Sequence, residues 1–266
     1  MKHTKEFTLT NNGSECFVVM PADDIISRAV YLYGSFDFDK FEKTIQILIS
    51  KNYKIETLID VGANIGTICI PALKRNLVRN AIAIEPELKN FRLLSANILL
   101  NDLSDKIHSH NIALGDKSKQ TLNFELSSCN SGDHRVQANV SQDQKMQSKE
   151  HSRVITVKSE KFDDIIPNMN SCSQLIWIDT QGYEAFVLEG ATTATNQRVP
   201  VVIEFWPAAI ERTKTLDLLK KNIFKYHQFY DLSQNNPISM QINDETISNL
   251  YLALQKSNSS TDILLL

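Results

Sequence analysis

The sequence has only four cysteines, and their positions exclude two common small-domain architectures. Cys16, Cys69, Cys129 and Cys172 are scattered, with no Cys-x-x-Cys pair and no cluster with histidine at metal-ligand spacing. A zinc module and a disulfide framework are therefore not expected. Cys69 and Cys172 lie in or beside apolar segments, where a free cysteine usually packs as a small hydrophobic side chain.

The sequence also lacks long hydrophobic runs and any excess of basic residues. No apolar stretch approaches the roughly 20 residues that a membrane helix needs, and residues 1–10 are polar where a signal peptide would have an apolar core. The net charge is -3 and no lysine- or arginine-rich run occurs. Neither nucleic acid nor a membrane is therefore expected as a partner. We predict a cytoplasmic protein; its oligomeric state is left open.

What the chain does contain is enough hydrophobic material for one large domain with a modest N-terminal addition. Hydrophobic residues make up 42% of its 266 residues, an ordinary fraction for a globular protein. Residues 1–56 predict an N-terminal cover: Phe7–Val19 forms two strands around an Asn-Asn-Gly turn, and two helices follow. Asp23 or Asp24 caps the first helix, Gly34 ends it, and Asp37 caps the second.

From Thr57 onward, short apolar strands alternate with helical segments. Near-continuous apolar strands of this kind are typical of a mostly parallel sheet with helices on both faces. The predicted strands are Thr57–Val61, Ala81–Ile84, Ile107–Leu114, Leu175–Ile178, Val199–Phe205, Tyr226–Leu232 and Asn249–Leu254. The predicted helices include Ile65–Leu77, Pro86–Asn101, a segment through Phe186 and Leu188, and Leu216–Phe224.

The alternation pauses at about residues 119–158. Thr121–Leu126 and Val154–Val157 predict an inserted hairpin, and residues 139–152 between them form a polar loop. A loop of this length inside a compact domain is either functional or disordered. Two interpretations therefore stand, a lid over a substrate and a disordered segment.

The segment Asp60–Gly66 follows a buried strand and opens a helix, which favours a ligand-binding turn. Glycine at 62 and 66 lets the backbone turn tightly and approach a ligand, and the helix start offers unpaired N–H groups. The spacing Gly-x-x-x-Gly differs from the dinucleotide pattern Gly-x-Gly-x-x-Gly. Asp60 would repel a pyrophosphate and attract a cationic aminoacyl group.

The next two strand ends supply further carboxylates. Glu85 ends the second strand, where an acidic side chain can accept hydrogen bonds from both hydroxyls of an adenosine ribose. Asp116 follows the third strand and can accept from an adenine amino group, with the backbone of Ile112 or Ala113 against the ring. The alternative is that all of these are ordinary turn residues. Agreement among three strand ends favours a nucleoside site.

These motifs closely resemble the FkbM family of methyltransferases, which are mostly O-methyltransferases. The resemblance covers most of the chain, in the right order. The segments that carry it are Asp24–Arg28, Asp60–Gly66, Ala83–Pro86, Asn111–Asp116, Ser131–Arg135, Phe162–Asp164, Trp177–Glu184, Leu188–Ala191, Val202–Glu204 and Asp262–Leu264. The family usually has a lysine where Trp177 stands.

The resemblance implies a Rossmann-like class I methyltransferase domain over residues 57–266, with a mostly parallel seven-stranded sheet. It implies S-adenosyl-L-methionine as the cofactor. The residues expected to bind this cofactor are Asp60, Gly62, Asn64, Gly66, Glu85, Pro86, Ala113, Asp116 and Asp179.

Methyl transfer depends mainly on positioning the two reactants, and a hydroxyl acceptor must also lose its proton. The candidates for catalytic side chains are Asp179, His134 and Glu204. Arg135, Glu184 and Trp206 are candidates for binding the substrate. Each has a structural alternative: Asp179 as a helix cap, Glu184 as a partner of the helix dipole, and His134 as a solvated loop residue.

The main hypothesis is S-adenosylmethionine-dependent O-methylation of a small molecule, such as a sugar or a secondary metabolite. Two alternatives are an NAD-dependent oxidoreductase and a methyltransferase-like binding module that has lost catalysis. The missing third glycine and Asp60 weigh against the first alternative, and Trp177 is the feature that favours the second. No metal-binding residue is assigned, because the spacing of the carboxylates Asp163, Asp164, Asp179 and Glu184 specifies no site, and metal dependence is left open.

Overall fold

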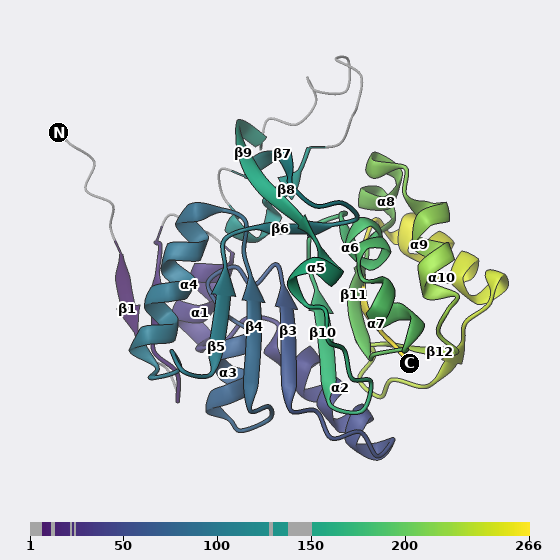
Figure 1. The fold of residues 1–266 in the computed structure, drawn as a ribbon, viewed down its shortest axis with the longest axis horizontal. Coiled ribbons are helices and arrows are strands. Elements are labelled where there is room, and N and C mark those ends of the chain that lie inside the picture. The colour runs from purple at the N-terminus through teal and green to yellow at the C-terminus, as the bar shows by residue number, and fades with distance from the viewer. Residues whose placement is uncertain (1–6, 12–13, 22, 24, 128–129, 138–150) are drawn as a thin grey trace.

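The computed structural model describes residues 7–11, 14–21, 23, 25–127, 130–137 and 151–266. A mixed sheet of eight strands forms its centre (Figure 1), in the order β13-β12-β14-β11-β10-β3-β4-β5. Five neighbouring strands are parallel: β11 (Val201–Phe205), β10 (Gln174–Ile178), β3 (Thr57–Val61), β4 (Asn80–Ile84) and β5 (Ile107–His110). The antiparallel part is β14 (Thr261–Leu265), β12 (Gln228–Asp231) and the two-residue β13 (Met240–Gln241).

The order of the parallel strands determines where a ligand can bind. Numbered along the chain, these five strands lie in the order 3-2-1-4-5, which is the doubly wound Rossmann-like arrangement. The order reverses between β3 and β10. In open α/β sheets, ligands bind at such a point, beyond the carboxyl ends of the strands.

The strands are apolar on both faces because helices cover both. Leu58 of β3 belongs to one core cluster, together with side chains of α1 (Ile26–Tyr33), α2 (Phe38–Ser50), α3 (Cys69–Lys74) and α4 (Leu88–Leu100). The next residue, Ile59, belongs to the cluster on the other face. The helices that follow the inserted hairpin are α5 (Phe162–Ile165), α6 (Glu184–Gly190), α7 (Thr192–Asn196), α8 (Pro207–Thr213), α9 (Leu216–Ile223) and α10 (Asp244–Ser257).

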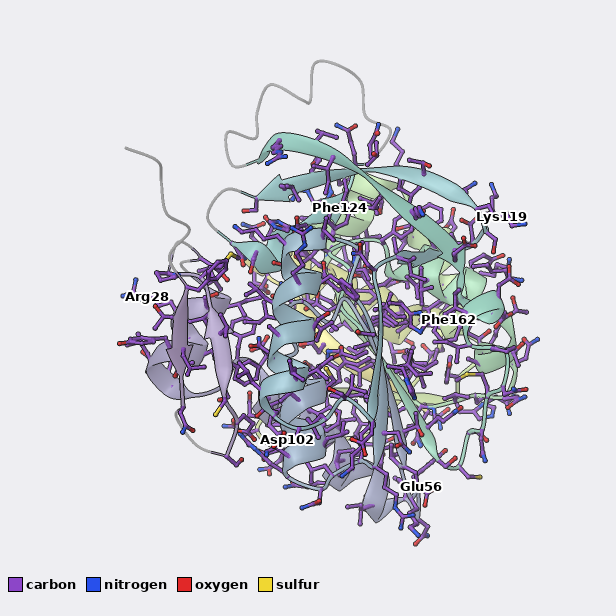
Figure 2. The ribbon with its side chains drawn as sticks, turned by 60° about the vertical axis from the view of Figure 1, so that its left-hand side comes forward. Arg28, Glu56, Asp102, Lys119, Phe124 and Phe162 are labelled. Atoms are coloured by element: carbon purple, nitrogen blue, oxygen red, sulfur yellow. The ribbon has the colours of Figure 1, made fainter. Side chains whose placement is uncertain are left out.

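A second, four-stranded sheet lies above the carboxyl ends of the parallel strands (Figure 1). It consists of β6 (Ala113–Gly115), β9 (His151–Lys161), β7 (Gln120–Ser127) and β8 (Arg135–Val136). Phe124 is the centre of its small core with Ala113 and Val157. Figure 2 shows Phe124 in this second sheet and Glu56 at the opposite end of the molecule. The predicted inserted hairpin is therefore present as β7 and β9.

The N-terminal segment packs beside α4. β1 (Thr8–Thr10) pairs antiparallel with β2 (Phe17–Val19), and the backbone N–H of Val18 donates to Asn97 Oδ1 at 2.6 Å. Asp23 accepts hydrogen bonds from the backbone N–H groups of Ile25 and Ser27 at the start of α1, but the N-cap position itself belongs to Ile25. Gly34 ends the helix, as predicted. The division of the chain between residues 56 and 57 stays a prediction.

Several predicted elements differ from those in the structure. Asn249–Leu254 is part of α10 and not a strand, because Asn243 and Thr246 form a capping box that starts a helix there. The predicted strand Ile107–Leu114 is divided between β5 and β6, which belong to different sheets. Asp37 stands at the start of α2 but makes no capping hydrogen bond, because its backbone is left-handed with φ of 55°.

The sheet also has eight strands where seven are predicted. Its edge includes the two-residue β13, and β14 was not among the predicted strands. The predicted features that fall on Asn12, Gly13, Asp24, Cys129 and residues 139–150 lie outside the described residues. In the part of the chain that the structure describes, no helix is long and apolar enough to cross a membrane.

Candidate functional site

The turn after β3 is built by two glycines. Gly62 and Gly66 have φ of 93° and 95°, the left-handed region that favours glycine. A Cβ on Gly62 would lie 1.9 Å from the backbone oxygen of Asp179, and one on Gly66 would lie 2.6 Å from Ile70 Cδ1. Both glycines therefore make room for neighbouring protein atoms. The close approach of Gly62 to Asp179 lies at the reversal point between β3 and β10.

Asp60 lies beneath this turn and is buried. Its Oδ2 accepts a hydrogen bond from the backbone N–H of Cys69 at 3.2 Å, at the start of α3. Burial raises the pKa of Asp60 to about 7, because a charged carboxylate loses its hydration there. A cationic group placed beside Asp60 would favour its ionised form.

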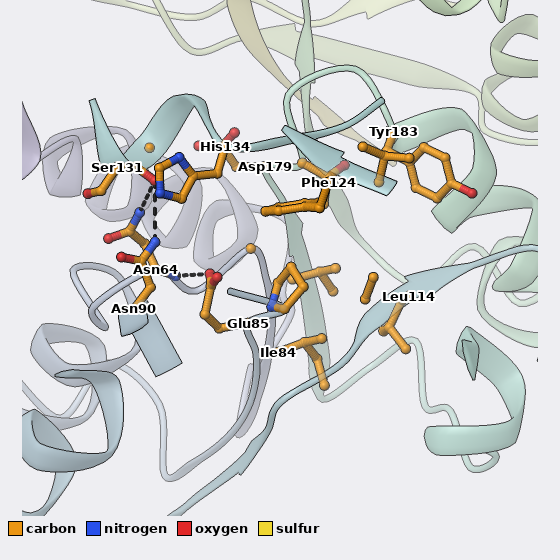
Figure 3. Close-up of a pocket in the computed structure, with 17 residues that line it drawn as sticks. Asn64, Ile84, Glu85, Asn90, Leu114, Phe124, Ser131, His134, Asp179 and Tyr183 are labelled. Atoms are coloured by element: carbon orange, nitrogen blue, oxygen red, sulfur yellow. Dashed lines mark hydrogen bonds between the residues drawn. The ribbon is translucent and has the colours of Figure 1, made fainter. Parts of the chain in front are cut away.

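Glu85 connects the turn after β3 to the turn after β4. Its Oε2 accepts from the backbone N–H of Asn64 at 3.0 Å, and its Oε1 accepts from the backbone N–H of Glu87 at 2.8 Å. Burial raises the pKa of Glu85 to about 8. The Asn64 amide in turn donates from Nδ2 to the backbone oxygen of Ser131 at 3.0 Å, below the second sheet (Figure 3).

These side chains border a pocket of about 500 Å³, called here the apolar pocket. Its walls combine hydrophobic side chains of the main sheet with Phe124 of the second sheet, and Tyr183 closes one side (Figure 3). The residues that line it include Ile84, Pro86, Ala113, Leu114, Phe124, Val136 and Tyr183, and the polar Asn64, Glu85, Asn90, Ser131, His134 and Asp179. This volume includes space that is open to solvent.

A second pocket of about 530 Å³, the acidic pocket, lies on the other side of the glycine turn. Asp37, Asp60, Asp179 and Asp262 line it, together with Trp177 and other residues. Lys40 Nζ lies 2.7 Å from Asp262 Oδ2 and 3.1 Å from Asp37 Oδ2. The apolar and acidic pockets share four lining residues, namely Gly62, Asn64, Gly132 and Asp179. The apolar and acidic pockets therefore adjoin each other at these four residues.

One amide joins two carboxylates, Asp179 directly after β10 and Glu204 near the end of β11. Gln181 Nε2 donates to Asp179 Oδ1 at 2.7 Å and to Glu204 Oε2 at 3.2 Å. Burial and, after it, the negative charge of Asp262 together raise the pKa of Asp179 to about 7. Burial and the charge of Asp179 also raise the pKa of Glu204 well above its usual range. Each of these two carboxyl groups therefore keeps its proton to a higher pH than an exposed carboxyl does.

Glu184 shapes the turn that carries Asp179. Its Oε1 accepts from the backbone N–H of Thr180 at 2.9 Å and of Gly182 at 3.1 Å. The side chain is buried at the start of α6 and is absent from the residues that line the apolar and acidic pockets. Asp179 is not at the N-cap of this helix, a position that Tyr183 holds.

The segment between β7 and β8 places His134 in the apolar pocket. His134 Nδ1 accepts from the backbone N–H of Ser127 at 3.0 Å, and its ring meets the ring of Phe124 edge-on at 6.4 Å. The neighbouring Arg135 donates from Nε to Glu125 Oε2 at 3.3 Å and lies outside the linings of both pockets. His134 is thus a wall of the pocket, and Arg135 is held by the second sheet.

The remaining candidates lie around a third pocket of about 1290 Å³, the basic pocket, named for Lys117, Arg212 and Lys214 in its lining. Asp116 lines this pocket and not the apolar one, and its Oδ2 lies 3.9 Å from Lys117 Nζ. Trp206 precedes α8 and packs under Arg212, whose guanidinium carbon lies 5.5 Å from the ring centre.

Sequence reasoning missed four residues of this region, Asn90, Phe124, Gln181 and Tyr183. Gln181 stands in the Trp177–Glu184 motif, so its polarity beside Asp179 was a usable signal. The other three reach the apolar pocket from α4, β7 and the start of α6, and only the tertiary fold brings them together. Among the described residues, no group of histidine, cysteine and carboxylate side chains is arranged to hold a metal ion.

Comparison with known sequences gives one family. A family model described as "Methyltransferase FkbM domain" matches residues 60–255. That range includes every side chain discussed above from Asp60 to Arg212. No curated protein sequence matches the chain.

Solved structures similar to this chain include three methyltransferases. The methyltransferase FkbM from Methylobacillus flagellatus KT is 16% identical with a TM-score of 0.45; the match covers 80% of this chain and 44% of that one, less than half its length. The M. jannaschii tRNA m1G37 methyltransferase is 11% identical, with a TM-score of 0.42 and coverages of 99% and 56%. Geranyl diphosphate C-methyltransferase from Streptomyces coelicolor A3(2), in complex with Mg²⁺, geranyl diphosphate and S-adenosyl-L-homocysteine, is 10% identical, with a TM-score of 0.40 and coverages of 85% and 78%.

Proposed function

The chain belongs to the FkbM family of methyltransferases, and from this premise we propose that it transfers a methyl group from S-adenosyl-L-methionine to a hydroxyl group of a small molecule, such as a sugar or a secondary metabolite. The observation that carries the proposal is the junction at Gly62 and Asp179 between an apolar and an acidic pocket. An adenosine that is linked to a cationic aminoacyl chain has the same division of properties.

The apolar pocket fits the adenosine part of this cofactor. Each carboxylate oxygen has two acceptor positions, and the backbone N–H groups of Asn64 and Glu87 use one on each oxygen of Glu85. One position on each oxygen is left, which suits the two hydroxyls of a ribose. Ile84, Leu114 and Phe124 offer apolar surface to the adenine ring.

The acidic pocket fits the positively charged part. Asp60 and Asp179 are buried carboxylates whose pKa burial raises to about 7. An ammonium or sulfonium group beside them would offset the cost of burying their negative charge. S-Adenosyl-L-methionine, when bound, supplies a methyl group that its sulfonium activates for in-line attack.

Asp179 and Glu204 are proposed to take the proton of the acceptor hydroxyl. The Gln181 amide fixes the separation and orientation of the two carboxyl groups. Because their pKa values are raised, the ionised member of the pair is a stronger base than an exposed carboxylate. His134 lies in the apolar pocket, on the adenosine side, and is proposed to contribute packing and a hydrogen bond there.

The decisive measurement is calorimetric binding of S-adenosyl-L-homocysteine and of NADH to the full chain. We expect S-adenosyl-L-homocysteine to bind and NADH not to bind, since Asp60 would face the pyrophosphate. Binding of NADH alone would favour an oxidoreductase. Binding of S-adenosyl-L-homocysteine without methyl transfer to any hydroxyl compound of a broad panel would favour an inactive binding module.

A matched pair of variants tests the position of the adenosine. Glu85→Gln removes acceptor capacity at the ribose, and we expect it to weaken binding of S-adenosyl-L-homocysteine by at least about tenfold. Glu56→Gln makes the same change at the opposite end of the sheet (Figure 2) and should leave the affinity unchanged. Equal affinities of the two variants would contradict the proposed orientation. The absence of a nucleic-acid partner stays a prediction.

A further inference from the structure

Arg212 is a half-buried cation without a carboxylate partner. Its Nη2 donates to the backbone oxygen of Gln181 at 2.6 Å, and its guanidinium lies over the ring of Trp206. Its Nε is buried and has no hydrogen-bond partner. None of the ion pairs within 4.0 Å among the described residues includes Arg212. A buried donor and charge left in this state are costly, and an anionic ligand would satisfy both.

The surroundings of Arg212 reinforce its positive charge. The basic pocket lies between β7 of the second sheet and the segment from α6 to α8, with Lys117 and Lys214 in the lining. Asp116, the carboxylate of this lining, is within ion-pair distance of Lys117. Arg212 and Lys214 therefore give the pocket a net positive charge. Burial lowers the pKa of Arg212 and the charge of Arg135 also lowers it, while the more weakly acting charges of Asp133, Glu184 and Glu125 raise it.

The basic pocket adjoins the proposed reaction centre. Val136 and Tyr183 line both the basic and the apolar pocket. Gln181 also connects the two regions, because its backbone oxygen accepts from Arg212 and its side-chain amide donates to Asp179. A ligand group held by Arg212 would thus be separated from the carboxylates Asp179 and Glu204 by the residue Gln181.

We infer that the basic pocket binds the acceptor and that Arg212 holds a carboxylate or phosphate group which the acceptor carries. This inference rests on the proposed function and narrows its substrate class to anionic hydroxyl compounds. The planar guanidinium presents its nitrogens in a fork that matches the oxygens of a carboxylate or a phosphate. The two oppositely charged pockets then have separate tasks: the acidic pocket receives the aminoacyl chain of the cofactor, and the basic pocket receives the acceptor.

The test compares three sugars that differ in charge. The full chain, saturated with S-adenosyl-L-homocysteine, is titrated with glucose, glucuronate and glucose 6-phosphate in a calorimeter. We expect at least one of the anionic sugars to bind about tenfold or more tightly than glucose. Arg212→Gln should remove this preference, and Arg212→Lys should retain part of it, since the charge remains while the fork is lost.

The controls separate this inference from the fold and from the proposed function. Arg79→Gln changes an exposed arginine that pairs with Glu56, and should keep the preference. A Lys117→Gln, Lys214→Gln double variant leaves Arg212 and its packing intact, and should weaken binding of the anionic sugar. Failure of S-adenosyl-L-homocysteine to bind would overturn the proposed function. Binding of it without any preference for anionic sugars, or a preference unchanged in Arg212→Gln and in the double variant, would overturn this inference alone.

Discussion

At the scale of single residues, Gly62 is where the proposed site depends most on the absence of a side chain. Its φ of 93° and the 1.9 Å separation between an added Cβ and the Asp179 oxygen leave no room for alanine. We expect Gly62→Ala to lower the free energy of unfolding by about 2–4 kcal/mol, measured by urea denaturation. At Gly132 an added Cβ meets the flexible end of the Ile26 side chain, so Gly132→Ala should cost less. A larger loss at Gly132 would contradict this account.

Gln181 is the residue through which the proposed base can be tuned without touching a carboxylate. Its amide donates to Asp179 and thereby lowers the pKa of that carboxyl, against the larger effect of burial. Gln181→Leu should therefore move the acidic limb of the pH profile of kcat/KM upward by about one pH unit. Gln181→Glu adds a negative charge and should move it further. An unmoved limb, with unchanged affinity for S-adenosyl-L-homocysteine, would exclude the pair as the base.

At the scale of elements, the second sheet forms one wall of the apolar pocket through Phe124 of β7. Removing that ring should weaken binding of S-adenosyl-L-homocysteine by about tenfold, because an aromatic surface against the adenine is lost. The matched control is Val154→Ala, which trims an exposed side chain of β9 in the same sheet. The measurement is the affinity of both variants for S-adenosyl-L-homocysteine, determined by calorimetric titration. Equal weakening would mean that the sheet matters only for stability.

The elements also show why sequence reasoning succeeded in part. The parallel strands were predictable because they are buried on both faces and so are nearly continuous apolar runs. Asn249–Leu254 has a similar local composition, and its helical state depends on the cap at Asn243. β14 is also a short, mostly apolar run, but sequence reasoning did not include it among the strands. The division of β5 from β6 follows from Asn111, which bonds to the backbone of Glu85 and Pro86.

The candidate site also has a part that the sequence predicts and a part that it does not. Asp60, Gly62, Glu85 and Asp179 stand at strand ends, so their meeting at one edge follows from parallel topology alone. Arg212 reaches the neighbouring basic pocket from α8, at a distance set by how the helices pack on the sheet. No repeating pattern of residues in the sequence determines how these helices pack. The acceptor side was therefore the less predictable half of the site.

At the scale of the whole molecule, charge is segregated around the proposed site. Carboxylates that burial makes harder to ionise gather in and beside the acidic pocket, and cations line the basic pocket. The chain as a whole carries only -3. The small net charge therefore does not reflect the local electric field at the site. That field is negative in the acidic pocket, where the cofactor is proposed to place its aminoacyl chain, and positive in the basic pocket, where the anionic acceptor is proposed to bind.

This segregation predicts how stability depends on pH. Asp60, Glu85 and Asp179 have pKa values raised to about 7, 8 and 7 in the folded protein, so between their ordinary values and these the folded chain holds protons that the unfolded chain has lost. Stability must then fall as pH rises through this window. Asp231 and Glu189 have lowered pKa values and act in the opposite sense, but only at acid pH.

We therefore expect the Tm of the ligand-free protein to fall as the pH rises from about 5 and to level off above about pH 8, measured by calorimetry at constant ionic strength. Glu85→Gln carries no proton to lose, so its Tm should fall less over the same range. Glu56→Gln, which changes an exposed carboxylate, should follow the wild type. A Tm that stays level or rises through this range would show that the buried carboxylates ionise near their ordinary pKa values, and the proposed proton transfer to Asp179 and Glu204 would lose its basis.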